Sequence, residues 1–260
     1  MSQKKKTKKF HIGLALSGGG SRSVAHLGMI QALIEKGYEI SMVSGTSAGA
    51  IIGALYCRGF SPKSILNILE SINYLNVFRP AFNWKALLNL EIAENALKDY
   101  FPEDDFSSLE IPFVLATTDF NNGKIKYFKR GQLIKPLIAS CSIPVIFTPV
   151  NINGHFYADG GILDNLPIEP LKKKCNFIIG LHSNPIGKRY ANASNWKGQL
   201  ERALLLTFSS RDRMKMKKCN IFLEPEKLVN YHIFDFKKLR EIYDIGYEFA
   251  QKELELLPFK

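Results

Sequence analysis

Apolar residues occur along the chain in short blocks that alternate between the periods of strands and of helices. Residues 10–16 form a short apolar run that ends at three glycines, as is typical of a buried strand. The apolar positions of 23–36 recur at helical spacing, and Gly37 ends that run. Residues 41–44 and 48–57 repeat the order of strand and then helix. This alternation predicts a parallel α/β sheet.

The rest of the chain carries similar signals. Two Asn-Gly dipeptides, at 122–123 and 153–154, lie between apolar segments and favour β-hairpins. Residues 184–195 are polar and predict a loop. The remaining apolar segments predict helices over 62–71, 92–100, 132–141, 196–218 and 235–257, and strands over 112–118, 124–128, 147–153, 155–158, 177–182 and 221–223.

Residues 60–106 differ from the sheet-forming segments on either side. They contain an aromatic stretch at 74–84 with Pro80 inside it. We expect a helical and aromatic cap over the site, and a cluster that only packs helices together is the alternative. Residues 10–260 are predicted to form a single domain, preceded by a disordered basic tail at 1–9.

The charge raises the question of partners. Lysine and arginine number 35 against 24 acidic residues, and hydrophobic residues make up 46% of the chain, which excludes a disordered protein. Five lysines lie within 1–9, and 172–218 holds twelve basic and two acidic residues, so the remainder is slightly acidic. No nucleic-acid motif accompanies these segments, and we expect no nucleic-acid partner. Peripheral contact with an anionic membrane surface is the hypothesis that we retain.

The cysteines and the N-terminal segment give evidence about the cellular compartment of the protein. The chain has four cysteines, none closer than 34 residues to the next, so there is no C-x-x-C spacing for a metal or a redox centre. The lysine-rich start followed by an apolar run resembles a signal peptide, but His11 interrupts the run and glycines follow it. We therefore expect a cytoplasmic protein with free thiols that contacts membranes at most peripherally.

The first chemical motif is a G-x-S-x-G segment at Gly45–Gly49, between a predicted strand and a predicted helix. A sharp strand-to-helix turn lifts the side chain of Ser47 off the sheet, and Gly45 and Gly49 let the strand and helix approach. The helix N-terminus at Ala48 favours developing negative charge. A chance pattern in a small-residue turn is the competing explanation.

The second motif is a glycine-rich loop that also joins a predicted strand to a predicted helix. Consecutive glycines, Gly18, Gly19 and Gly20, let backbone N–H groups point into one concavity, where they can bind phosphate or an oxyanion. Arg22 beside them suits an anion. A dinucleotide site is disfavoured because Ser23 stands where the third glycine of G-x-G-x-x-G belongs. A plain tight turn is the alternative.

The third motif is Asp159-Gly160-Gly161, at the end of a predicted strand. Alone, it reads most simply as a turn aspartate. Together the three motifs place a nucleophile, oxyanion donors and a carboxylate at strand ends, where ligands of open α/β sheets collect.

The base that activates Ser47 has several candidates. A Ser-His-Asp triad needs a histidine, and a direct Ser47–Asp159 dyad needs a buried carboxylate within about 3 Å of the hydroxyl. The histidines that follow the serine are His155, His182 and His232. None lies in a glycine-rich, strand-end setting like that of Asp159, and His26 on the first helix suits packing. We therefore favour the dyad.

With these motifs in order, the chain resembles the patatin-like phospholipase family from about residue 10 to the last helix. Gly18–Arg22 resembles the family's oxyanion loop, Gly45–Gly49 its nucleophile elbow, Asp159–Gly161 its D-G-[AG] motif, and 142–149 the segment that commonly precedes it. Ser23 departs from the pattern, since the family's loop usually ends in glycine.

The resemblance implies a three-layer α/β/α fold with a mostly parallel sheet, and hydrolysis of lipid carboxyl esters without a metal or a cofactor. It assigns Ser47 as the nucleophile and Asp159 as its partner. It implies that Arg22 orders the loop or contacts a lipid phosphate. The residues expected around the oxyanion are Gly18, Gly19, Gly20, Arg22 and Ala48. The alternative is an inactive relative that binds lipid at a membrane surface.

Overall fold

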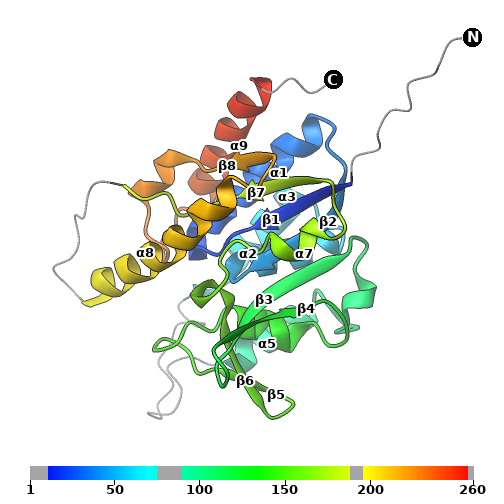
Figure 1. The fold of residues 1–260 in the computed structure, drawn as a ribbon, viewed down its shortest axis with the longest axis vertical. Coiled ribbons are helices and arrows are strands. Elements are labelled where there is room, and N and C mark those ends of the chain that lie inside the picture. Colours follow the sequence, from blue (N-terminus) through cyan, green and yellow to red (C-terminus); the bar gives the residue numbers. More distant parts are fainter. Residues whose placement is uncertain (1–10, 75–89, 188–195, 257–260) are drawn as a thin grey trace, which may run out of the picture.

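The structure, a computed structural model, describes residues 11–74, 90–187 and 196–256. In these ranges the chain is a mixed α/β fold whose central sheet is flanked by helices (Figure 1). The strands are β1 (Ile12–Leu16), β2 (Ile40–Thr46), β3 (Phe113–Asp119), β4 (Lys124–Phe128), β5 (Val150–Ile152), β6 (His155–Asp159), β7 (Phe177–Leu181) and β8 (Ile221–Leu223). The helices are α1 (Ala25–Glu35), α2 (Ala48–Cys57), α3 (Pro62–Ser71), α5 (Leu90–Lys98), α6 (Ile134–Ser140), α7 (Glu169–Lys172), α8 (Trp196–Met216) and α9 (Leu239–Glu255).

The sheet has the order β5-β6-β3-β2-β1-β7-β8, and β4 also pairs with β3. The strands β3, β2, β1, β7 and β8 are parallel, whereas β4, β5 and β6 join them antiparallel. The chain leaves β1 for β2 on one side and returns to β7 on the other. The strand order therefore reverses between the neighbouring strands β1 and β7, and ligands of such sheets bind at the carboxyl ends of the strands at this switch point.

One edge of β3 is shared by two strands. Residues Thr117–Asp119 pair with both β4 and β6, and Leu115–Ala116 pair with both β4 and β2, so β2 and β6 lie on the edge opposite β4. β2 runs parallel to β3 and β6 runs antiparallel to it. Their carboxyl ends consequently meet head to head beside Ala116 and Thr117.

The two faces of the sheet bury separate apolar clusters, because side chains alternate along each strand. In β1, Leu14 and Leu16 belong to the larger cluster, with residues of α1, α2, α3 and α9, whereas Ala15 faces the smaller one. Leu171 of α7 closes the smaller cluster. Helices thus cover both faces (Figure 1), and the predicted three-layer α/β class is confirmed.

Most predicted elements are present. The predictions for α2, α3, β4 and β8 are correct at both ends, and both Asn-Gly hairpins form, between β3 and β4 and between β5 and β6.

Two predicted elements begin three or four residues too early, and one α-helix was missed. β5 starts at Val150 because the preceding residues form turns, with the N–H of Phe147 bonded to the carbonyl of Ile143 at 2.8 Å. α9 starts at Leu239, after a turn between Asp235 and Lys238. The short helix α7 was not predicted, because four residues show too little periodicity.

The aromatic stretch of the predicted cap and the basic tail lie largely outside the described residues. The aromatic stretch 74–84 is described only at Tyr74, whose ring stacks on that of Phe236 with 4.0 Å between centroids. The basic tail at 1–9 is not described at all. Among the described helices, none combines the length and hydropathy that crossing a bilayer requires.

Candidate active site

Ser47 lies at the sharp turn between β2 and α2. Its backbone has a φ of 54°, a left-handed conformation that costs a non-glycine residue about 1–3 kcal/mol. The turn is held by Ser140, whose hydroxyl accepts a hydrogen bond from the N–H of Ser47 at 2.9 Å and donates one to the carbonyl of Ala116 at 2.8 Å. The surroundings thus support a strained nucleophile elbow of the predicted kind.

The glycines on either side of Ser47 are required by close packing. A Cβ atom on Gly49 would lie 2.4 Å from the carbonyl oxygen of Ser17, and one on Gly45 would lie 2.6 Å from that of Gly49. Real Cβ atoms do not approach backbone so closely. The elbow therefore packs directly against the end of β1, where the glycine loop begins.

The structure brings Ser47 and Asp159 together. Thr46 is paired with Ala116, and Asp159 with the next residue of β3, Thr117, so the meeting ends of β2 and β6 place the two side chains side by side. Asp159 is only 3% exposed. Burial raises its pKa to about 6, while hydrogen bonds from the Ser47 hydroxyl and the Gly161 N–H partly oppose the shift. The Gly161 bond is 2.7 Å long.

Both glycines of the third motif are in contact with the site. A Cβ on Gly160 would lie 2.3 Å from the carbonyl oxygen of Ala116. One on Gly161 would lie 3.0 Å from the ring of Phe208 in α8. This crowding keeps the backbone close enough for the Gly161 N–H to reach the Asp159 carboxylate.

The glycine loop follows β1 at the switch point, and its N–H groups are not equivalent. The N–H of Gly18 donates to the carbonyl of Asn165 at 3.2 Å. Within the described residues, the N–H groups of Gly19, Gly20 and Ala48 have no hydrogen-bond partner. Of the expected N–H donors, these three remain available for a ligand oxygen, whereas the N–H of Gly18 is already bonded to Asn165.

Arg22 points away from any ligand and into the protein. It is 4% exposed, its Nε donates to the carbonyl of Tyr231 at 2.7 Å, and its Nη2 lies 3.7 Å from Glu201 of α8. Burial lowers its pKa, and the charges of Glu201 and Asp235 partly compensate. Of the two roles expected for Arg22, this geometry matches the ordering of the loop.

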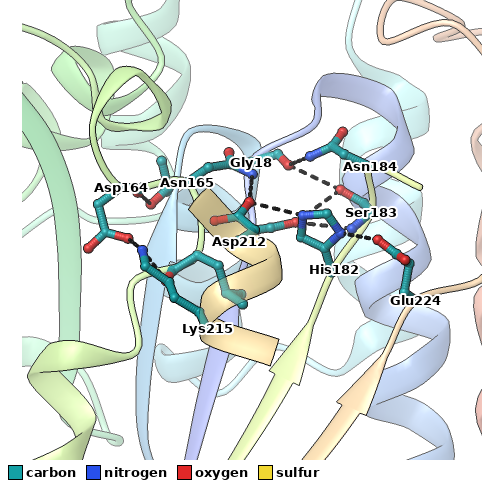
Figure 2. Close-up of polar contacts among 12 residues, drawn as sticks. Gly18, Asp164, Asn165, His182, Ser183, Asn184, Asp212, Lys215 and Glu224 are labelled. Carbon is teal, nitrogen blue, oxygen red and sulfur yellow. Dashed lines mark hydrogen bonds and ion pairs between the residues drawn. The ribbon is translucent and has the colours of Figure 1, made fainter. Parts of the chain in front are cut away.

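His182 is enclosed by carboxylates, as Figure 2 shows. Its Nε2 lies 3.0 Å from Asp212 and its Nδ1 2.5 Å from Glu224. Burial alone lowers its pKa, but hydrogen bonds and charges from both carboxylates outweigh burial and raise the pKa to about 9. A charged imidazole with both nitrogens engaged is not a base for Ser47.

The other histidines are exposed or are bonded to groups other than Ser47. His155 is exposed at the start of β6, the opposite end from Asp159. His232 bonds Glu201 at 2.9 Å. His26 is buried with Nε2 2.9 Å from the carbonyl of Ser17, and burial lowers its pKa to about 4. The geometry thus favours Asp159 as the partner of Ser47.

Several residues around the site escaped the sequence reasoning. Ser140 holds the elbow, Asn165 holds Gly18, and Asn184, expected in a polar loop, is fully buried against the glycine loop. None of the three belongs to a motif that carries a local signal in the sequence. No group of three or more His, Cys, Asp or Glu side chains in the described ranges is arranged to hold a metal ion.

Known proteins share both the sequence pattern and the fold. A family model described as patatin-like phospholipase matches residues 14–172. An uncharacterized NTE family protein of Mycobacterium tuberculosis is 35% identical over 162 residues, which are 62% of this chain and 45% of that protein. Lysophospholipase NTE1 of Scheffersomyces stipitis is 26% identical over 278 residues, covering 93% of this chain and 18% of that protein.

The crystal structure of VipD from Legionella pneumophila shares the fold, with a TM-score of 0.53 at 18% identity, over 95% of this chain and 67% of that one. This likeness concerns the fold alone. The chain spans less than half the length of the NTE relatives it matches.

The buried imidazolium makes a prediction for stability. Unfolded histidine has a pKa of about 6.5, so the higher folded pKa stabilises the protein fully below about pH 6.5. This contribution is lost as the pH rises through about 9. We expect His182→Gln to lower the free energy of unfolding in urea by about 3 kcal/mol more at pH 6 than at pH 9.5.

A packing variant serves as the control. Phe222→Leu removes the ring that stacks on His182 but no titrating group. It should therefore lower the free energy of unfolding by the same amount at both pH values. An equal loss for His182→Gln at pH 6 and pH 9.5 would mean that the imidazole is uncharged in the folded protein.

Proposed function

This chain belongs to the patatin-like phospholipase family, and we propose that it hydrolyses the carboxyl esters of lipids with Ser47 as nucleophile and Asp159 as general base. The observation that carries the proposal is the contact between these two side chains at the meeting ends of β2 and β6. A buried carboxylate with a pKa of about 6 is ionised at neutral pH, yet more basic than an ordinary aspartate.

The proposed reaction has two halves. Ser47 Oγ attacks the ester carbonyl carbon while Asp159 accepts the hydroxyl proton. The tetrahedral intermediate collapses, the alcohol leaves with the proton from Asp159, and the acyl group remains on Ser47. A water molecule then attacks the acyl-enzyme, again giving its proton to Asp159, and the fatty acid departs as Ser47 regains a proton.

The negative charge on the former carbonyl oxygen needs donors that are already in place. We propose the N–H groups of Gly19, Gly20 and Ala48, because the N–H of Gly18 is bonded to Asn165. The N-terminus of α2 at Ala48 adds the favourable end of a helix dipole.

The substrate class follows from the relatives. NTE1 of Scheffersomyces stipitis is named a lysophospholipase, and we propose phospholipid or lysophospholipid esters for this chain. The competing proposal is a lipid-binding protein without turnover. A strained, partly exposed serine hydrogen-bonded to a buried carboxylate supports the hydrolase, since binding alone needs neither feature.

We further propose that α8 holds the site against an anionic membrane. The helix belongs to the basic segment at 172–218 and packs beside the site through Phe208, which contacts Gly161. Arg213 and Lys217 are exposed at its end and just beyond it. Each well-placed cation contributes about 1 kcal/mol at an anionic surface.

The dyad is tested by two substitutions. Ser47→Ala and Asp159→Asn should each lower the hydrolysis of a chromogenic acyl ester by about 10³-fold or more. Ser47→Ala should also abolish labelling by an alkyl fluorophosphonate, which in the wild type should reach one label per chain at Ser47. Asp119→Asn, at the end of β3, is the matched carboxylate control. Wild-type turnover in either dyad variant refutes the dyad, and an unlabelled but lipid-binding wild type favours the competing proposal.

The pKa of Asp159 predicts the acid limb of the rate profile. Protonated Asp159 cannot accept the serine proton, so kcat/KM should rise with pH through about 6 and level off above it. Asp119→Asn should leave this midpoint in place. A rate that is flat from pH 5 to 8 would exclude Asp159 as the base.

Membrane contact is tested with vesicles. Reversing two exposed charges at the end of α8, in Arg213→Glu/Lys217→Glu, should weaken sedimentation with phosphatidylserine vesicles by about tenfold or more, and salt should do the same to the wild type. Lys63→Glu/Lys252→Glu makes the same charge change on α3 and α9, in the other helical layer, and should bind normally. Equal loss in both variants would show that only net charge matters.

A further inference from the structure

Gly18 lies between two strand ends that approach it from opposite sides. β1 ends at Leu16, which is paired with Gly45 on β2 and with Leu181 on β7. Two residues beyond these paired positions, just past the strand ends, Gly18 lies between Ser47 and Ser183. A Cβ on Gly18 would lie 3.0 Å from the Cβ of Ser47, so the nucleophile is in direct contact on one side.

The carbonyl of Gly18 points to the β7 side. It accepts a hydrogen bond from the hydroxyl of Ser183 at 3.1 Å and one from the side-chain amide of Asn184 at 2.6 Å (Figure 2). Both side chains are fully buried. Two donors from one strand end therefore fix the rotation of the Gly18–Gly19 peptide plane.

That rotation decides where the next N–H points. In a trans peptide the carbonyl of one residue and the N–H of the next point in opposite directions, and all described peptide bonds are trans. With the Gly18 carbonyl turned towards β7, the Gly19 N–H is turned away from β7, towards the side on which Ser47 lies.

We propose that Ser183 and Asn184 are positioning residues that aim the Gly19 N–H at the acyl oxygen by holding the Gly18 carbonyl. This inference rests on the proposed function and extends it to residues outside the three motifs. Neither side chain touches the reacting atoms, because each acts through the peptide that it orients.

We call the two hydrogen bonds from Ser183 and Asn184 to the Gly18 carbonyl the clamp. Residues behind the glycine loop hold this clamp in place. Asn165 takes the N–H of Gly18 through its carbonyl and donates its side-chain amide to Asp212 at 2.9 Å. Asp212 also binds His182, the residue that precedes Ser183 (Figure 2). Gly18 is therefore held at both its N–H and its carbonyl, and the end of β7 is tied to α8.

The test measures kcat and KM for p-nitrophenyl butyrate and the rate of fluorophosphonate labelling. We expect kcat to fall about tenfold in Ser183→Ala and about 10²-fold in Asn184→Ala, with KM within about threefold of the wild type. Labelling should slow in parallel, because the phosphonyl oxygen uses the same donors. Asn184→Asp keeps the size of the side chain but replaces the donating amide with an oxygen, and it should lose at least as much as Asn184→Ala.

A matched control separates an effect on the orientation of the Gly19 N–H from the general effect of losing a buried hydroxyl. Ser44→Ala removes a buried hydroxyl on β2 that donates to a backbone carbonyl outside the glycine loop, that of Pro167 at 2.6 Å. It should keep kcat within about threefold. If Asn184→Ala does not fold, Ser183→Ala decides. Wild-type kcat in Ser183→Ala and Asn184→Ala, or a rise in KM alone, overturns the inference.

The outcomes also separate this inference from the function beneath it. If the wild type hydrolyses the ester, Ser47→Ala does not, and the clamp variants match the wild type, the inference fails and the proposed hydrolase stands. If the wild type and Ser47→Ala are equally inert, the proposed hydrolase fails and takes the inference with it.

Discussion

The edge of β3 that pairs with both β2 and β6 is the constraint on which the candidate site depends. β2 can follow β3 only as far as Ala116, because β6 occupies the same edge from Thr117 onward. The two strands run towards each other, so the residue after β2 and the last residue of β6 must meet. Backbone hydrogen bonds of the sheet thereby hold Ser47 against Asp159, and no flexible side chain has to search for its partner.

The same geometry explains why small residues surround the site. The elbow, the glycine loop and the D-G-G turn pack backbone against backbone, with distances that leave no room for a Cβ on Gly45, Gly49 or Gly160. Polar side chains fill the remaining hydrogen bonds of this crowded backbone, as Ser140 does for the N–H of Ser47 and Asn184 for the carbonyl of Gly18. A candidate site built in this way is rigid without a ligand, which suits the proposed stabilisation of an oxyanion.

Two buried charged groups have opposite consequences for stability. Asp159 is buried with two hydrogen bonds and no cation described beside it, so its raised pKa marks a carboxylate whose ionisation destabilises the folded protein: the cost sets in above about pH 4 and is complete above about pH 6. His182 is buried between two carboxylates, and its raised pKa marks an ion pair that stabilises the fold below about pH 9. The first is the cost of removing a carboxylate from water. The second anchors the strand end that carries Ser183 and Asn184.

The sequence by itself determined the α/β class, most helices and strands, both hairpins and the three motifs, because periodicity and turn chemistry are local properties. The extents of α2 and β4 follow from such local patterns, and the prediction of Asp159 as the partner of Ser47 rests on the position of both motifs at strand ends. Only the tertiary structure decided that Arg22 faces the interior, that Gly18 has its N–H occupied, and that Asn184 leaves the predicted loop to clamp the glycine loop. Those contacts join segments more than 140 residues apart, and a lone asparagine or arginine does not encode which distant backbone group it will meet.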